Sequence, residues 1–446
     1  MDIISITAQL ILCLSILVVL HECGHFFPAK WFKTRVEKFY LFFNPGFSLF
    51  KKQIGETEYG IGWIPFGGYV KISGMIDESM DTEQMAQEPQ PWEFRSKPAW
   101  QRLIIMLGGV TVNFILGILI FAGIMWYYGE SYINSKDMTY GVYATDLGRE
   151  IGIEDGDKIV SIGDLQFEKF KPSFVTQEIV INDPKTLTVS RDGNNIQLPI
   201  PKGLAEKLTK YENKGKGLFG MRIPQKVTAV EKKKPAGKIG LQIDDQIIGV
   251  NGKNTYWLHE FREAIADKEN QELKLTVLRN KKDTLLLTAT LGDDGRIGIE
   301  NALGDAFYEV QRQKYTLGQA IPRGWTKSYD FLTSQLKAFK GMFTGKIKAT
   351  DSLGSVLSIA NMFDPAWDWE QFWRITAILS ILLGFFNLLP IPALDGGYVM
   401  FLMWEVITGR KPNDKFMEYA TIGGFFILIA LMIFALGLDV SKWFRG

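Results

Sequence analysis

The sequence HECGH, residues 21–25, directly follows the apolar run IISITAQLILCLSILVVL of residues 3–20. Its two histidines, His21 and His25, stand four positions apart on one face of a helix, so both imidazoles can reach a single metal ion. Glu22, beside the first histidine, is placed to take a proton from water at that ion. Two histidines and a carboxylate are costly in an apolar membrane helix and usually mark function there. The stretch therefore predicts a zinc site inside a bilayer.

Composition and charge narrow the class of protein. The chain has 446 residues, a formal net charge of +1 and a mean hydropathy near zero. This charge gives no reason to expect nucleic acid as a partner, and the hydropathy fits membrane spans combined with a large soluble insert. The two cysteines, Cys13 and Cys23, lie in the first apolar segment, where a disulfide within one helix is geometrically implausible.

Four apolar segments are long enough to cross a bilayer. They cover residues 3–29, about 100–128, a stretch that starts near Phe372 and is interrupted at Pro390 and Pro392, and about 419–436. No lysine or arginine precedes Lys30, so the first segment lacks the basic region of a signal peptide and is expected to remain as a transmembrane helix.

Basic residues indicate the orientation of the chain in the membrane. They cluster between the first two spans, at Lys30, Lys33, Arg35, Lys38, Lys51, Lys52, Lys71, Arg95, Lys97 and Arg102. The positive-inside rule places residues 30–98 in the cytoplasm, and it places both termini and the long region after the second span on the outer side. The histidine pair then lies toward the cytoplasmic end of its helix.

The region between the first two spans predicts strands rather than a loop. Aromatic and glycine residues make 39–52 and 57–75 too apolar for an ordinary loop, with turns expected at Asn44-Pro45-Gly46 and Gly67-Gly68. This sheet either dips into the membrane, where protein or a cavity must satisfy its backbone, or lies on the membrane surface. The acidic residues 77–93 are typical of a mobile linker.

Residues 130–350 carry most of the charge and contain an internal repeat. GIEDGDKIVSIGD at 152–164 matches GLQIDDQIIGVNG at 240–252, an offset of 88 residues. A spacing of this size predicts two tandem small domains rather than a solenoid.

Two further predictions concern the end of this region. Residues 315–362, in which Trp325, Phe331 and Leu336 are interleaved with lysines, predict an amphipathic helical segment along the outer membrane surface. His259, in the second copy of the repeat, is expected to be a surface residue.

The third zinc ligand is expected to be a carboxylate within the membrane, since zinc hydrolases take three protein ligands and leave one position for water. Asp395 is the one acid between Arg374 and Glu405, and the topology brings it to the depth of the histidine pair. Glu405 remains an alternative ligand, although it lies beyond the broken segment. The chemistry of such a site is metal-assisted peptide hydrolysis, with Glu22 as general base and later as proton donor to the leaving amine.

Asn113 lies one helical turn from Gly109 in the second span. It is expected either to pack between helices through one hydrogen bond or to lie near the metal site. Backbone groups freed by the break at Pro390–Pro392, or the strand edge at 60–72, could pair with an unwound substrate.

Four motifs together resemble the site-2 protease family, and in particular its bacterial sigma-E-regulating branch. They are HECGH in the first span, GGYVKI at 67–72, GVTVN at 109–113 and NLLPIPALDGG at 387–397, and the likeness covers essentially the whole chain. The tandem insert resembles paired PDZ domains. The resemblance implies an intramembrane zinc protease that cuts transmembrane segments of single-span proteins. The substrates that the resemblance implies are anti-sigma factors already trimmed by an upstream site-1 type protease, and signal-peptide remnants.

The resemblance also assigns residues. His21, His25 and Asp395 match the zinc ligands, and Glu22 matches the catalytic acid. Asn387 matches an auxiliary polar residue near the substrate, while Gly67, Gly68 and Tyr69 match a substrate-handling hairpin. The location implied is the bacterial inner membrane, in contact with lipid, with the PDZ-like domains in the periplasm.

The expected fold class is a polytopic α-helical membrane protein with four transmembrane helices, a membrane-associated β-hairpin or sheet and two tandem PDZ-like α/β insert domains. The expected divisions are 1–33 (first helix), 34–98 (β region and linker), 99–129 (second helix), 130–224 and 225–305 (PDZ-like domains), 306–370 (amphipathic surface segment), 371–409 (third, broken segment) and 410–446 (fourth helix and tail). Two rival functions remain at this point. One is a non-catalytic PDZ membrane scaffold, and the other is a different HExxH membrane metallopeptidase that uses Glu405 as a ligand.

Overall fold

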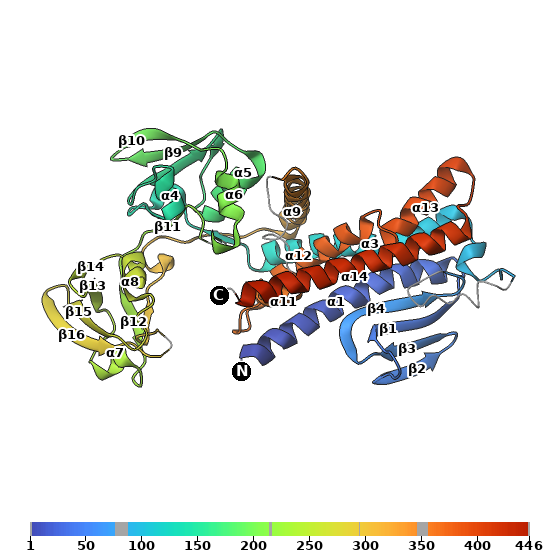
Figure 1. Ribbon diagram of the computed structural model, residues 1–446, viewed down its shortest axis with the longest axis horizontal. Coiled ribbons are helices and arrows are strands. Elements are labelled where there is room, and N and C mark those ends of the chain that lie inside the picture. Colours follow the sequence, from blue (N-terminus) through green and yellow to red (C-terminus); the bar gives the residue numbers. More distant parts are fainter. Residues whose placement is uncertain (1, 76–87, 214–215, 294, 346–355, 445–446) are drawn as a thin grey trace. The chain divides into compact units, whose positions relative to one another are not determined.

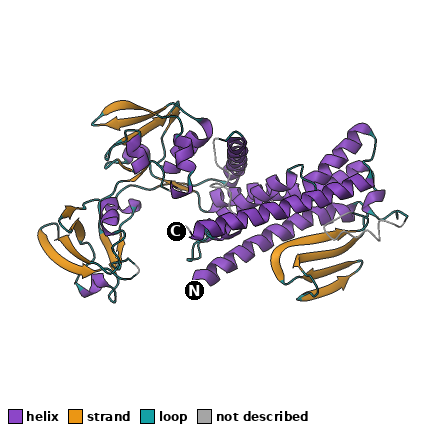
Figure 2. Cartoon of the chain, viewed as in Figure 1, coloured by secondary structure: helices purple, strands orange, loops and turns teal. Residues whose placement is uncertain are grey.

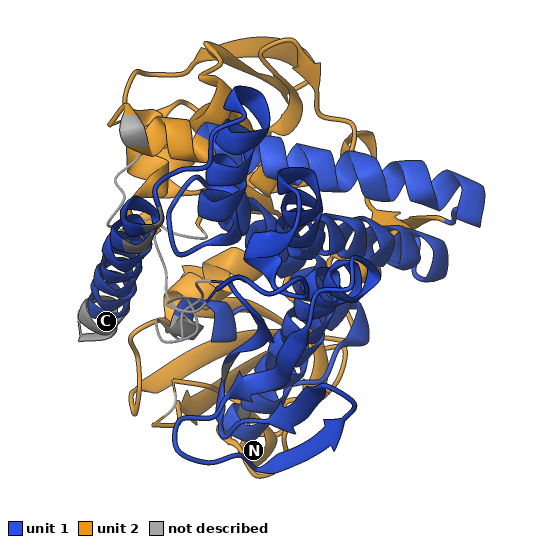
Figure 3. Ribbon diagram, turned by 90° about the vertical axis from the view of Figure 1, so that its right-hand side faces the viewer, with its two compact units in different colours: residues 1–129, 314–337, 353–446 blue, residues 130–313, 338–352 orange. Residues whose placement is uncertain are grey.

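The structure is a computed structural model that describes residues 2–75, 88–213, 216–293, 295–345 and 356–444. It divides into two compact units (Figure 3). The first, called the membrane unit, contains residues 1–129, 314–337 and 353–446, and the second, called the insert, contains residues 130–313 and 338–352. Stretches of chain that are far apart in the sequence therefore build the membrane unit together.

Within the described residues, four helices of the membrane unit are long and apolar enough to cross a bilayer. They are α1 (Asp2–Trp31), α3 (Ala99–Tyr127), α12 (Trp369–Leu388) and α14 (Asp414–Phe444), the long helices of this unit in Figure 1. Large apolar side chains such as Leu119, Phe426 and Ile433 remain exposed on them, which suits lipid rather than water. The four predicted spans are confirmed.

The third span is broken, as its prolines predict. α12 ends at Leu388, the chain turns through residues 389–394, and α13 (Asp395–Thr408) begins. Within the turn, Ala393 has a φ of 83°, a left-handed conformation that is unfavourable for a residue with a Cβ. The break makes Asp395 the first residue of a new helix.

α3 lies at the centre of the membrane unit, where it packs against α1, α12 and α13. Gly24 of α1 and Gly108 of α3 let two backbones touch, because a Cβ on Gly108 would lie 1.8 Å from the carbonyl oxygen of Gly24. Close contact of this kind holds the helix that carries the histidines directly against the helix that carries Asn113.

A second helix that contacts α3 is α9 (Leu317–Phe343). Its Gly324 lies against α3, where a Cβ would be 2.5 Å from the carbonyl oxygen of Ile118. On its other side Trp325 and Leu336 are exposed. Residues 346–355 of the predicted amphipathic segment lie outside the described residues, and α11 (Val356–Ala360) follows.

One sheet of the membrane unit has the strand order β2-β3-β1-β4 (Figure 1). Its strands are β1 (Val36–Phe43), β2 (Phe50–Ile54), β3 (Thr57–Ile61) and β4 (Ile64–Ile72). The predicted turn at Gly67-Gly68 is wrong, since both glycines lie inside β4. Gly68 instead allows a strand to approach a helix closely, because a Cβ there would lie 2.5 Å from Cγ1 of Val18 in α1.

The predicted linker at 77–93 is only partly described, since residues 76–87 lie outside the described residues. Its end is not a free linker. The backbone N–H of Arg35 donates to the carbonyl of Trp92 at 2.9 Å, and Glu93, 4% exposed, pairs with Arg95 of the short helix η1 (Phe94–Ser96) at 2.6 Å. The prediction fails here because acidic composition does not reveal a buried ion pair.

The insert contains two four-stranded sheets with the same strand order, β8-β7-β9-β10 and β14-β13-β15-β16 (Figures 1 and 2). The first half contains α4 (Asp146–Glu150), β7 (Lys158–Ile162), β8 (Leu165–Gln166), α5 (Pro172–Asn182), β9 (Thr186–Arg191), β10 (Asn194–Pro199) and α6 (Leu204–Thr209). The second half contains α7 (Pro235–Lys238), β13 (Gln246–Val250), β14 (Lys253–Asn254), α8 (Leu258–Ile265), β15 (Glu272–Arg279) and β16 (Asp283–Thr290). The two halves joined by the sequence repeat thus share one strand order.

Three pairs of short strands complete the insert. They are β6 (Val142–Ala144) with β11 (Phe219–Met221), β12 (Val227–Val230) with β17 (Ile299–Asn301), and β5 (Glu130–Tyr132) with β18 (Gln311–Gln313). The last pair brings the two ends of the stretch 130–313 together. Met138, which precedes the first half, is 2% exposed in the core around the second sheet. The chain therefore contributes to the second core before it builds the first.

Candidate metal centre

α1 presents two histidines to α3. His21 and His25 are 8% and 7% exposed, and their Nε2 atoms lie 3.3 Å apart. Gly109 of α3 leaves the space they occupy, because a Cβ there would lie 2.3 Å from Nε2 of His25. The helical spacing of HECGH and a missing side chain on the facing helix together bring the two imidazoles to one point.

Asp395 completes a group of three ligand atoms. Its Oδ2 lies 3.4 Å from Nε2 of His21 and 3.4 Å from Nε2 of His25. In the described part of the chain, this is the group of three metal-binding side chains whose ligand atoms lie within 4.8 Å of one another. Ligands about 2.0–2.1 Å from a tetrahedral centre are about 3.4 Å apart, so the observed spacing fits Zn²⁺ with a fourth position left for water.

Hydrogen bonds around the site favour a cation at its centre. Nδ1 of His25 lies 2.8 Å from the carbonyl oxygen of Ile105, which can only accept, so Nδ1 donates and Nε2 of the neutral ring keeps its lone pair. Oδ2 of Asp395 is buried and has no hydrogen-bond partner in the described part of the chain. Lone pairs that converge without a donor are satisfied by a metal ion.

Asn113 and Asn387 both contact His21. The side-chain nitrogen of Asn113 lies 2.9 Å from Nδ1, and that of Asn387 lies 3.3 Å from Nε2. A ring that binds metal through Nε2 carries its proton on Nδ1, which then needs an acceptor. The side-chain oxygen of Asn113 lacks a partner among the described residues, so exchanging the oxygen and nitrogen of this amide satisfies both groups. The sequence left open whether Asn113 packs between helices or lies near the metal site, and the structure shows that it contacts His21.

Glu22 follows His21 on α1 and is half-buried. Its carboxylate lies near the backbone of Val70 on β4, the strand that α1 contacts. Among the described strands, β4 pairs only with β1, so its other edge has no strand partner. The carboxylate next to the ligands thus adjoins an edge strand.

Gly67, Gly68 and Tyr69 lie on that same strand. The hydroxyl of Tyr69 donates to Oδ1 of Asn44 at 2.9 Å. Burial raises the pKa of Tyr69 to about 12, so the phenol stays protonated as a donor. Among the described contacts, none joins these three residues to the ligand group, so the structure does not bring them to it.

Two other predictions are resolved by contacts. Glu405, the alternative ligand, pairs with Arg102 at 2.5 Å and lies outside the group of three. His259 was expected at the surface, and this is wrong. It is 8% exposed and stacks on Tyr143 with ring centroids 4.4 Å apart, because the second copy of the repeat packs on the first at this point.

Two features of the site were missed by sequence reasoning. The carbonyl of Ile105 orients His25, and a backbone group leaves no signal in a sequence. The Arg102–Glu405 pair joins α3 to α13, and its signal was a cation and an acid, each within an apolar segment.

Comparison with known proteins defines the class. The model of peptidase family M50 matches residues 9–431 of this chain. The chain therefore belongs to peptidase family M50, the site-2 protease family, and it is a metalloprotease with membrane-spanning helices.

Individual relatives match along nearly the whole chain. The "Regulator of sigma-E protease RseP" of Escherichia coli (strain K12) is 27% identical over 454 residues, which cover 98% of this chain and 98% of that protein. The "Regulator of sigma E protease" of Haemophilus influenzae is 26% identical over 447 residues, 97% of this chain and 98% of that protein. A Rickettsia conorii protein named "Putative zinc metalloprotease RC0203" is 28% identical over 444 residues, with the same coverage.

Proposed function

We propose that this protein is a zinc metalloprotease that hydrolyses peptide bonds within the transmembrane segments of single-span membrane proteins. One observation carries the proposal. Three ligand atoms lie at the spacing of a tetrahedral zinc site, two of them on α1, which is long enough to cross a bilayer, and the third at the start of α13, directly after the broken third span. A soluble metalloprotease would have no reason to place its ligands there, given the cost of polar groups in an apolar helix.

His21, His25 and Asp395 would hold the ion, with Asn113 fixing the tautomer of His21 and the Ile105 carbonyl fixing that of His25. Zinc, when bound, supplies Lewis-acid polarisation and lowers the pKa of a water molecule. Glu22 takes the proton of the attacking water and then delivers it to the leaving amine. Asn387, within 3.3 Å of His21, is placed to donate a hydrogen bond to the substrate carbonyl as charge develops on its oxygen.

The substrate must be an extended strand at the point of attack, because a helix buries the peptide bond that water has to reach. The unpaired edge of β4 offers backbone groups to such a strand beside Glu22. Gly67 and Gly68 lie on this strand, and we propose that they take part in holding the substrate there. The break at residues 389–394 offers a second set of backbone groups near Asp395.

The names of the relatives support a substrate class. Two are called regulators of sigma E, so we propose anti-sigma-factor-like single-span proteins as substrates, cut after a first external cleavage by a site-1 type protease, together with signal-peptide remnants. We place the protein in a bacterial inner membrane, with both termini and the insert on the periplasmic side and the metal centre toward the cytoplasm. The basic residues of 30–98 support this orientation.

The proposal is tested with purified protein in detergent or vesicles and a single-span substrate without a periplasmic domain. The native chain is expected to cut within the span, whereas Glu22→Gln is expected to keep one zinc per chain and lose cleavage, because the amide cannot take the proton of water. Glu56→Gln, at an exposed acid of the sheet region, is the matched control and is expected to cut normally. Residual activity above a few per cent in Glu22→Gln contradicts the base assignment. A zinc-free native chain that binds but never cuts substrates supports the scaffold alternative instead.

For the insert we propose two PDZ-like domains that act as a size filter against substrates with bulky external domains. Since β5 and β18 pair, the chain can be rejoined by a two-residue hairpin turn after removal of residues 133–310, without stretching the membrane unit. This variant is expected to cut untrimmed substrates faster than the native chain does. Loss of cutting for both trimmed and untrimmed substrates, with zinc still bound, contradicts the filter and favours capture of substrate tails by the domains.

A further inference from the structure

A buried ion pair joins α3 to α13 away from the metal ligands. Nη2 of Arg102 lies 2.5 Å from Oε1 of Glu405, and the two side chains are 7% and 17% exposed. Nε of Arg102 also donates to the carbonyl of Lys97 at 2.9 Å, so the guanidinium is held from two sides. Glu405 lies ten residues after Asp395 on α13, about 15 Å along the helix axis.

The direction of α13 is not fixed by α12, the helix before it, because the two helices are not continuous. The turn at residues 389–394 interrupts the backbone hydrogen bonds of the span, and Ala393 in that turn has a φ of 83°. The apolar contacts of α13 with α3, through Tyr398, Val399 and Leu402, hold the helices together but are not directional. A charged hydrogen bond from a planar guanidinium fixes direction as well as distance.

One face of α3 contacts both helices that carry the three ligands, α1 and α13. Arg102, Ile105, Gly109 and Asn113 follow one another at helical spacings of three and four residues. Ile105 orients His25, Gly109 makes room for both rings, and Asn113 contacts His21. Of these four residues, Arg102 forms an ion pair with the helix that carries Asp395.

We infer that Arg102 and Glu405 are positioning residues that set the orientation of α13, and through it the place of Asp395 in the metal centre. A buried ion pair contributes little net stability, because desolvation offsets most of the Coulomb attraction. The contribution of the Arg102–Glu405 pair is instead to fix the orientation of α13. The inference rests on the proposed zinc site, and it adds that the ligand sphere depends on a contact about 15 Å away.

The test compares variants of the full chain in detergent. Glu405→Gln keeps the size of the side chain and removes its charge, and it is expected to weaken zinc binding about 10-fold, the lower end of what outer contacts of metal ligands contribute. The double variant Arg102→Met/Glu405→Met removes the pair without leaving a buried charge, so it is expected to fold with an unchanged Tm and still bind zinc about 10-fold more weakly. Zinc affinity is measured by competition with a chelator, and the visible spectrum of Co²⁺-loaded protein reports the ligand geometry.

An ion pair of the same type serves as the matched control. Arg374 and Glu370 on α12 also lie 2.5 Å apart but are 50% and 32% exposed, and Glu370→Gln is expected to leave affinity and spectrum unchanged. The inference is overturned if the double Met variant binds zinc as tightly as the native chain with the same Co²⁺ spectrum. A native chain that binds no zinc would contradict the proposed function instead, so the two failures are distinguishable.

Discussion

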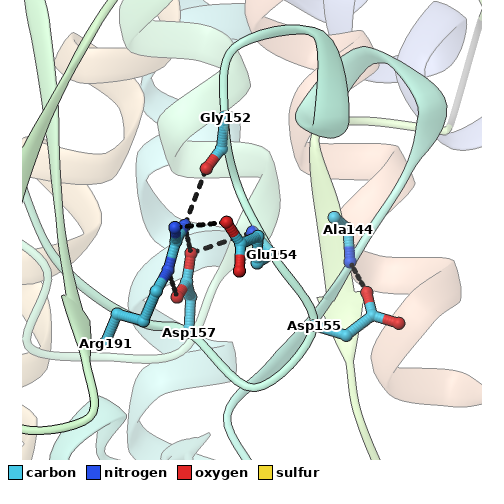
Figure 4. A network of polar contacts seen from close by, with 6 residues as sticks. All are labelled: Ala144, Gly152, Glu154, Asp155, Asp157 and Arg191. Atoms are coloured by element: carbon cyan, nitrogen blue, oxygen red, sulfur yellow. Dashed lines mark hydrogen bonds and ion pairs between the residues drawn. The ribbon is translucent and has the colours of Figure 1, made fainter.

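Buried carboxylates are treated in opposite ways in the two units. In the insert, Asp157 is 1% exposed and receives Nε and Nη2 of Arg191, both at 2.8 Å, and the backbone N–H of Glu154 at 2.9 Å (Figure 4). In the membrane unit, Asp395 turns Oδ2 toward two imidazole nitrogens and, within the described residues, finds no donor.

The insert contains a second buried carboxylate that is paired with an arginine in the same way. Asp245, 88 residues after Asp157, is also 1% exposed and receives Nε and Nη2 of Arg279 at 2.9 and 2.7 Å. Each arginine then donates to a glycine carbonyl of the same loop, Gly152 in the first half and Gly240 in the second. Asp157 and Asp245 accept hydrogen bonds from donors of the chain itself, so we call them closed carboxylates, and they stabilise the fold. A buried carboxylate oxygen without such a donor, as in Asp395, is an open carboxylate, and a ligand is expected there.

The largest expected effect comes from removing a ligand at the open site. Asp395→Ala and His25→Ala are each expected to lose zinc and proteolysis together, because two protein ligands hold zinc poorly. Metal analysis and a cleavage assay measure both losses on the same preparation. Asp245→Ala is the matched change at a closed carboxylate and is expected to retain one zinc per chain. Full zinc occupancy in Asp395→Ala requires a different third ligand.

A smaller effect on zinc binding is expected for a residue that contacts one of the proposed ligands rather than the ion. Asn113→Ala removes the partner of His21 Nδ1 and is expected to weaken zinc binding by roughly 10- to 100-fold. Ser380→Ala is the matched control, since its hydroxyl bonds only the backbone carbonyl of Asn113 among the described contacts. Chelator competition measures both. Equal zinc affinity in native protein and Asn113→Ala would make Asn113 a packing residue only.

At a closed carboxylate the expected loss is in stability rather than metal. Asp157→Asn removes the charge of one of the two carboxylates that pair with Arg191, Glu154 being the other, and is expected to destabilise the first half of the insert by about 2 kcal/mol, typical of a hydrogen bond to a charged group. Hydrogen exchange of residues 150–200 in the full chain measures this loss. Zinc content is expected to stay at the native value. A fall in zinc content with this variant would break the distinction between the two kinds of carboxylate.

The smallest effect concerns the contact between the halves of the insert. Burial lowers the pKa of His259 from its ordinary value, although Asp155, Glu260 and Glu263 act in the opposite direction. The unfolded chain therefore binds a proton more readily, so stability that is present above about pH 6.5 is lost as the pH falls through the lowered pKa.

This loss of stability is expected to be small, because the nearby carboxylates offset part of the effect of burial. It is measured as the change in Tm between about pH 7.5 and pH 5. His259→Phe keeps a ring against Tyr143 but does not titrate, so its change in Tm should be smaller than that of the native chain. Identical changes in both proteins would contradict this role.

The three side chains that meet at the open site could be predicted from the sequence, and the groups that orient them were harder to predict. His21, His25 and Asp395 were visible because polar residues in an apolar helix have few structural reasons to be there. The carbonyl of Ile105 was not, since every residue has one. Gly67 and Gly68 were predicted as a turn because glycine serves both turns and close approaches, and only the partner, Val18, decides between them. His259 was misplaced because its burial depends on the first half of the insert, which no local pattern reports.

The pairing of β5 with β18 has an entropic consequence. Tyr132 and Gln311 are register partners, so the backbone leaves and returns at points only about 5 Å apart. The strand pair therefore closes residues 133–310 into a loop, as the strands of a hairpin close its tip. The entropic cost of closing this long loop is offset by contacts within the insert. Lengthening or shortening the insert beyond this strand pair should leave the folding free energy of the membrane unit almost unchanged, which makes the insert a separable cassette on an otherwise continuous metalloprotease.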